Sequence, residues 1–150
     1  MGVEALEKAF HLACKKGLAE EVKKALAHGV DVEAADMNGT TGLMLASKYG
    51  CASVVCVLIE EADGVHLDQQ DDEGLTALMK AAKYNKTEVV QLLLDAGARA
   101  EVMDEWDETA ATKARPDSAV KALLLAALAK AKAKGKGGAE GGVAAKPDVD

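Results

Sequence analysis

Three histidines are the side chains of this sequence most suited to acid–base or metal chemistry near neutral pH. His11, His28 and His66 are widely separated, and none belongs to a His-x-x-x-His or His-Glu-x-x-His pair that would hold zinc on one face of a helix. The serines lack the Gly-x-Ser-x-Gly turn that presents a hydrolase nucleophile. No glycine-rich loop resembles a phosphate cradle. We therefore predict that the chain is not an enzyme and has no catalytic residues.

Cysteine offers a second route to chemistry, as a nucleophile, a metal ligand or half of a disulfide. Cys14, Cys51 and Cys56 are an odd set without a Cys-x-x-Cys pair, so neither a disulfide framework nor a zinc site is indicated. Cys14 stands next to Ala13 among small residues, which predicts a buried packing role. Cys56 is expected on an outer helix surface, where an exposed thiol would be open to oxidation.

Carboxylates are more numerous, and they cluster at residues 71–73 and 104–108. Neither cluster has the Asp-x-Asp-x-Asp-Gly pattern and the distal Glu of a calcium loop. We therefore predict no metal and no cofactor.

The composition limits the class of protein. The chain has 150 residues, of which 49% are hydrophobic and only 3% aromatic, so Ala, Leu and Val must build the core. No stretch approaches the roughly 18 consecutive apolar residues of a membrane span, and the first ten residues lack the regions of a signal peptide. The formal charge of −7 opposes binding to nucleic acid or to an anionic membrane. We expect an intracellular protein that binds neither, located in the cytoplasm and also in the nucleus.

The positions of these residues are governed by an internal repeat. Residues 36–50 align with residues 71–85 at an offset of 35, and ten of the fifteen positions are the same or nearly so. The blocks that follow, residues 52–60 and 87–95, align at the same offset. Steps of 33 in both directions extend the pattern, so four units begin near residues 3, 36, 71 and 104.

Each middle unit predicts a turn, a short helix, a second turn and a longer helix. Gly39 and Gly74 are placed to adopt positive φ in Asp-x-x-Gly turns, and Thr41 and Thr76 stand where helix N-caps are required. Apolar residues then recur at helical spacing. One such unit has two apolar faces and cannot bury both alone, so the units must stack. The expected fold is an all-α repeat solenoid.

The pattern Asp-x-x-Gly-x-Thr-x-Leu-x-x-Ala, followed by Val-Val-x-x-Leu-Leu and Gly-Ala, resembles the ankyrin repeat over residues 3–128. The resemblance implies an ankyrin-repeat stack of about four helix-turn-helix units with hairpin-like turn tips. The chain departs from the family where Pro is usual, because Gly42, Ala77 and Ala110 stand there. Asp107 replaces the turn glycine of the fourth unit, which makes that unit a degenerate terminal cap.

We divide the chain into an ankyrin-repeat domain at residues 3–132 and a disordered Gly/Ala/Lys tail at residues 133–150. The units of the domain are expected near residues 3–35, 36–70, 71–103 and 104–132. The tail has too few apolar residues to offset the entropy cost of ordering. Residues 1–128 carry a formal charge of −9 and the remainder +2, so the repeats are more acidic than the whole chain.

The acidic residues of the repeats allow two interpretations. Glu33, Asp68 and Glu101 share one repeat position, and further acids cluster at the turns. Turn starts favour Asp and a solvated edge favours charge, which would account for them without a function. Alternatively, they form an acidic ridge of turn tips that meets a basic surface of a partner protein.

A second recurrence concerns lysine and tyrosine. Lys48-Tyr49 and Lys83-Tyr84 occupy the same place in successive units, as does Lys15-Lys16 in the first unit. The resemblance implies that this place and the turn tips, where Trp106 is expected, face a concave binding groove. Tyr and Trp dominate interface energetics because they bury a large rigid area with a polar handle. The alternative is that these rings only cover neighbouring repeats.

We therefore predict a monomeric, non-enzymatic protein–protein interaction module, or adaptor, that binds a partner protein through its concave surface. The tyrosines and Trp106 would anchor the partner, and the acidic tips would steer its basic surface. The candidate contacts are Met37, Asn38, Thr40, Lys48, Tyr49, Asp72, Glu73, Leu75, Lys83, Tyr84, Glu105 and Trp106.

Three narrower or different functions remain as alternatives. The short four-unit layout is similar to that of myotrophin-like members of the family, which implies a regulator of actin-capping protein or of transcription factors. A structural assembly protein would use Cys51 or Cys56 for association. An enzyme or small-molecule binder would need an enclosed pocket, for which a thin helical stack has little room.

Overall fold

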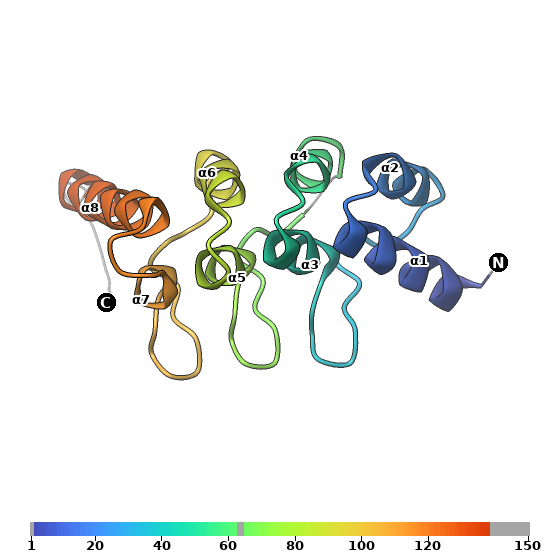
Figure 1. Cartoon of the computed structure of the whole chain (residues 1–150), viewed down its shortest axis with the longest axis horizontal. Coiled ribbons are helices and arrows are strands. Elements are labelled where there is room, and N and C mark those ends of the chain that lie inside the picture. Colours follow the sequence, from blue (N-terminus) through green and yellow to red (C-terminus); the bar gives the residue numbers. More distant parts are fainter. Residues whose placement is uncertain (1, 63–64, 139–150) are drawn as a thin grey trace.

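The computed structural model describes residues 2–62 and 65–138, with side chains as far as Lys132. Eight helices in this part of the chain stack as four pairs along one axis (Figure 1). The predicted all-α repeat solenoid is confirmed. The pairs are α1 (Val3–Lys16) with α2 (Ala19–Ala27), α3 (Gly42–Tyr49) with α4 (Ala52–Glu61), α5 (Ala77–Lys83) with α6 (Thr87–Asp95), and α7 (Ala110–Lys113) with α8 (Ala119–Gly138).

The helices form two rows. The inner row contains α1, α3, α5 and α7, and the outer row contains α2, α4, α6 and α8 (Figure 1). Hairpin-like turns project from the inner row on the side away from the outer row. Each turn is closed by a backbone hydrogen bond of 3.0 Å, in which the amide of the opening aspartate donates to the carbonyl four residues later. The three turns span residues 36–40, 71–75 and 104–108.

Aliphatic side chains fill the space between the rows. Leu58, Leu93 and Leu124 from the outer helices are fully buried, and so are the paired valines of α4 and α6. Phe10 of α1 is the only aromatic residue of the core among the described residues. A core of such small side chains lets the helices pack closely, as the composition indicates.

The predicted N-caps of two inner helices are confirmed. Thr41 caps α3, because its Oγ1 accepts a hydrogen bond of 3.4 Å from the amide of Met44. Thr76 caps α5 in the same way, with the amide of Met79 donating at 3.2 Å. The side chain of an N-cap residue thus satisfies one of the amides that the first turn of a helix leaves without a partner.

Neighbouring hairpins are joined through their backbones. The amide of Asp72 donates to the carbonyl of Asn38 at 3.0 Å, and the amide of Glu105 donates to the carbonyl of Glu73 at 3.3 Å. Gly74 lies at this junction with a φ of +80°, and a Cβ atom there would come within 2.9 Å of the Glu105 nitrogen. Glycine is therefore needed for its conformation and for its size.

The equivalent position of the last hairpin is Asp107, which also has positive φ, at +60°. No further hairpin follows it among the described residues, so a side chain has room there. Aspartate tolerates this conformation better than most residues. The loss of glycine in the fourth unit thus has a steric explanation.

We expect Gly74→Ala to lower the free energy of unfolding by about 3 kcal/mol, because the left-handed backbone and the contact with the next hairpin both oppose a methyl group. Gly29→Ala is the matched control, since Gly29 has a φ of +87° but no atom within 4 Å of the added Cβ. That variant should lose only the backbone contribution, about 1–2 kcal/mol. Urea denaturation measures both, and equal losses would contradict the steric contact between hairpins.

The last helix extends further than the predicted domain. Helix α8 continues to Gly138, whereas residues 133–138 are predicted from the sequence to begin the disordered tail. Alternating Ala and Lys have high helix propensity, which explains the extension as far as Lys134, whereas the glycines at 135, 137 and 138 are poor helix formers. The rest of the predicted tail, residues 139–150, lies outside the described residues. None of the described helices has both the length and the apolar character of a membrane span.

Candidate functional site

The aspartate that opens each hairpin organises its backbone. Asp104 Oδ1 accepts hydrogen bonds of 2.9 Å from the amides of Trp106 and Glu108. Asp36 and Asp71 make the same pair of bonds in their own hairpins, at 2.8–3.0 Å. These three aspartates therefore have a structural role, as the turn interpretation predicts.

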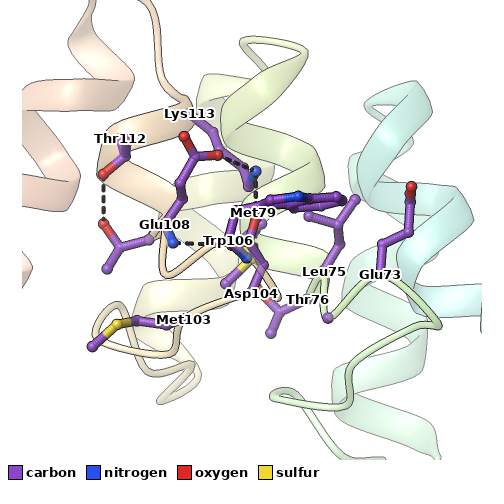
Figure 2. Close-up of polar contacts among 12 residues, drawn as sticks. Glu73, Leu75, Thr76, Met79, Met103, Asp104, Trp106, Glu108, Thr112 and Lys113 are labelled. Carbon is purple, nitrogen blue, oxygen red and sulfur yellow. Dashed lines mark hydrogen bonds and ion pairs between the residues drawn. The ribbon is translucent and has the colours of Figure 1, made fainter.

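The second oxygen of two of these aspartates contacts a lysine of the following inner helix. Lys80 Nζ lies 2.9 Å from Asp71 Oδ2, and Lys113 Nζ lies 2.6 Å from Asp104 Oδ2 (Figure 2 shows the second pair). The Asp104 side chain is fully buried and that of Lys113 is only 12% exposed. In the second unit Leu45 occupies the position of the lysine, so Asp36 cannot form this ion pair there.

The ion pairs shift the pKa values of three of their residues. Burial raises the pKa of Asp71 and of Asp104, but the hydrogen bonds from Lys80 or Lys113 and from the hairpin amides outweigh it, and both pKa values lie below the usual value. Burial lowers the pKa of Lys113, but Asp104 and Glu108 raise it further, so its net shift is upward. Asp71, Asp104 and Lys113 are therefore charged at neutral pH, and the two ion pairs hold the hairpins on the inner helices.

Trp106 lies at the tip of the last hairpin, above this ion pair. Its side chain is 59% exposed, and Lys113 Nζ lies 5.9 Å from the centre of its ring. Lys113 also pairs with Glu108 at 3.0 Å. In Figure 2 the indole extends from the ion pair towards the preceding hairpin, on the side of Leu75. The hairpin thus presents a large ring on a rigid base.

A row of alternating lysines and tyrosines follows the ends of the inner helices. Lys15 Nζ lies 5.5 Å from the ring centre of Tyr49, and Lys48 Nζ lies 5.4 Å from the rings of both Tyr49 and Tyr84. Lys83 Nζ completes the row at 5.7 Å from Tyr84. These distances are within the range of cation–π attraction. We call these five residues the Lys–Tyr ladder.

Comparison with known families decides what kind of solenoid this is. A family model described as ankyrin repeats (three copies) matches residues 2–71 and residues 63–134. The chain belongs to the ankyrin-repeat family. Ankyrin repeats are generally protein–protein interaction modules, and proteins of this family are typically non-enzymatic. A search of curated proteins finds no match to this chain.

The ankyrin stack divides the twelve predicted contact residues into two groups. Within the part of the chain that the structure describes, no hydrogen bond, ion pair or cation–π contact links one group to the other. The ladder contains Lys48, Tyr49, Lys83 and Tyr84. The hairpins contain Met37, Asn38, Thr40, Asp72, Glu73, Leu75, Glu105 and Trp106.

Leu75 is the one predicted contact that is buried. It is 8% exposed and belongs to the hydrophobic core, whereas Met37 and Trp106 extend into solvent. Leu75 closes its hairpin where the chain returns to α5, and an apolar side chain at that base packs against the helices. Leu75 is therefore not available to a partner in this structure.

Two of the acids that share a repeat position connect successive ankyrin repeats. Glu33 Oε2 accepts a hydrogen bond of 2.6 Å from the amide of His66, and Asp68 Oδ1 accepts one of 2.9 Å from the amide of Arg99. These bonds favour the structural interpretation for Glu33 and Asp68. The acids that remain exposed at the hairpin tips are Asp72, Glu73, Glu105 and Asp107.

Two residues of these arrangements are absent from the predicted contacts. Lys15 begins the ladder, and its alignment with Lys48 at 33 residues was visible in the sequence. Lys113 supports Trp106 and pairs with Asp104 nine residues before it, the same spacing as Asp71 and Lys80. That recurring spacing was the signal for the ion pairs.

The cysteines differ in their surroundings. Cys14 is fully buried, and burial, together with the nearby Cys51, raises the pKa of its thiol to about 12. It is therefore a thiol at neutral pH, which agrees with the predicted packing role. Cys51 is half-buried, and its Sγ donates to the carbonyl of Lys15 at 3.5 Å. Cys56, expected to be exposed, is also half-buried.

Proposed function

We propose that this ankyrin-repeat chain is a non-enzymatic adaptor that binds a partner protein with its Lys–Tyr ladder and its hairpin tips. The observation that carries the proposal is the exposure of its aromatic rings. Tyr49, Tyr84 and Trp106 are 43%, 40% and 59% exposed, whereas Phe10 is fully buried. A chain with so few aromatic residues therefore presents three of its four rings to solvent, although burial in the core would stabilise the fold.

The charges of the hairpin tips support a partner with a basic surface. Asp72, Glu73, Glu105 and Asp107 are exposed acids on two neighbouring hairpins. Exposed charges of one sign raise the association rate with a partner of the opposite sign and set its orientation. The rings supply the buried area, and an interface of about 800 Å² on each partner is the usual size of a specific complex.

Affinity capture from the native source, followed by mass spectrometry, tests the proposal. The variant Lys83→Glu with Tyr84→Ala should lose the partner that the wild-type chain recovers, because it reverses one ladder charge and removes one ring. A matched control on the outer helix α6, Glu88→Lys with Gln91→Ala, changes the same number of exposed residues and should recover the partner fully. Equal recovery by both folded variants would refute the proposed surface.

A narrower candidate is a myotrophin-like regulator of actin-capping protein, which the four-unit layout favours. Purified actin-capping protein added to the same captured chain tests it directly. Binding that the Lys83→Glu and Tyr84→Ala changes abolish would support this regulator. Capture of a different partner, with no retention of actin-capping protein, would leave the general adaptor and exclude the narrower one.

A further inference from the structure

We propose that the Lys–Tyr ladder receives an extended acidic segment of the partner, with a carboxylate at about every third residue. This inference rests on the proposed function and specifies the chemistry of the partner. The partner would then carry two charged regions. Its acidic segment would lie on the ladder, and its basic surface would face the acidic hairpin tips.

In the part of the chain that the structure describes, the ladder lysines have no carboxylate partner, unlike Lys80 and Lys113 of the same row of helices. Within residues 2–62 and 65–132, no acidic side chain lies within 4.0 Å of Lys15, Lys48 or Lys83. Lys80 and Lys113, by contrast, are nearly buried and form close ion pairs. Among the described residues, acids thus neutralise the structural lysines Lys80 and Lys113 but not the lysines of the ladder.

The helix dipole accounts for part of this arrangement. Lys15, Lys48 and Lys83 lie in the last turns of α1, α3 and α5, where a cation is favoured by the negative end of the dipole. The dipole does not account for the half-exposed rings between them. Each ring lies within 5.7 Å of two lysine ammonium groups, so cation–π attraction favours an arrangement of these charges in a row. A row that is already ordered loses less entropy when a ligand binds.

The spacing of the row selects the form of the ligand. The ladder has one lysine per repeat, and packed helices are about 8–10 Å apart. A segment in the extended polyproline II conformation has three residues per turn and rises about 3.1 Å per residue, so carboxylates three residues apart lie on one face and match this spacing. The two residues between successive carboxylates would then cross a tyrosine ring and could pack against it.

Single-stranded nucleic acid is the other anionic chain that lysines and aromatic rings can bind. The formal charge of −9 on residues 1–128 and the acidic hairpin tips oppose a phosphate backbone, which carries charge along its whole length. An acidic peptide segment is shorter and can be limited to the ladder. The observations therefore favour a protein segment.

The test uses the full chain and fluorescent peptides in which Glu occupies every third position among Ser and Gly. We expect saturable binding, detected by anisotropy, that weakens as salt is added. A peptide of the same composition with its Glu residues consecutive should bind less tightly, and a peptide with Lys at the same positions should not bind. Tighter binding of single-stranded DNA than of the spaced peptide would overturn the assignment.

Variants locate the binding on the ladder. Lys48→Met keeps the length of the side chain that contacts both rings and should weaken peptide binding about tenfold. Lys130→Met removes an exposed lysine of α8 outside the ladder and should leave binding unchanged. Equal effects of the two variants would overturn the proposal, provided that circular dichroism shows both to be folded.

Competition separates this inference from the proposed function. If the spaced peptide displaces the partner captured from the native source, both stand. If the Lys83→Glu and Tyr84→Ala changes abolish capture but the peptide does not compete, the adaptor function stands and the acidic segment is wrong. If those changes leave capture intact, the surface given under the proposed function is refuted, and the inference that rests on it is refuted with it.

Discussion

Lys113→Met is expected to lower the Tm of the chain by about 5–10 °C, because it leaves a buried carboxylate without its cation. Asp104 Oδ2 lies 2.6 Å from Lys113 Nζ, and the Asp104 side chain is fully buried. The same change removes the partner of Glu108 and the cation beneath Trp106. Thermal unfolding followed by circular dichroism measures the loss.

The double variant Asp104→Asn with Lys113→Met shows where the loss originates. It should regain much of the lost Tm, because most of the cost of breaking a buried ion pair is the charge that remains. Lys130→Met, which removes an exposed lysine of α8, should leave the Tm unchanged. An unchanged Tm in Lys113→Met itself would mean that the ion pair contributes nothing.

The pH dependence gives an independent check on the same pair. Because folding lowers the pKa of Asp104, its contribution to stability is present above the ordinary carboxyl pKa and is lost as the pH falls through the lowered value. The Tm difference between the wild type and Lys113→Met should therefore be largest near pH 7 and shrink below about pH 4. At the alkaline end, the contribution of Lys113 is complete below the ordinary lysine pKa and is lost as the pH rises from there through the raised value.

Gly42→Ala is expected to lower the free energy of unfolding by about 2–3 kcal/mol, because the core has no space for the methyl group. A Cβ at Gly42 would lie 2.8 Å from Phe10 Cε2 and 2.9 Å from Cys14 Sγ. Both neighbours are fully buried, so neither can move aside freely. Urea denaturation of the variant measures the effect.

Phe10→Leu should rescue Gly42→Ala. The repeat positions equivalent to Phe10 carry Leu43 and Leu78, and the position equivalent to Gly42 in the third unit already carries Ala77. Phe10→Leu alone should cost about 1 kcal/mol through the space that it leaves, and the double variant should be more stable than Gly42→Ala. Losses that simply add would show that the two residues are not coupled.

The elements of this fold could be predicted because their signals are local and recur. Thr41 and Gly39 set the helix start and the turn of the second repeat, and Thr76 and Gly74 do the same in the third. The absence of Pro at Gly42 was visible in the sequence, but its reason was not. That reason is the contact with Phe10, which lies in another repeat and depends on how the two helices pack.

The candidate site was predictable to the same extent. The lysines and tyrosines of α3 and α5 were found because they recur at a fixed period, and the structure brings them into one row. Leu75 was wrongly predicted to contact a partner, because its burial depends on how the hairpin returns to α5. The roles of Glu33 and Asp68 required knowing which loops of successive repeats lie together.

The two hairpin ion pairs are distributed unevenly along the chain. They restrain the third and fourth repeats, whereas Leu45 stands in place of the lysine in the second. Because each repeat contacts only its neighbours, such a stack can open from one end. We expect the first two repeats to separate before the others under load or heat. A ligand that contacts Lys15, Tyr49 and Lys83 would then connect the first two repeats to the third, and so stabilise the end of the stack that opens more easily.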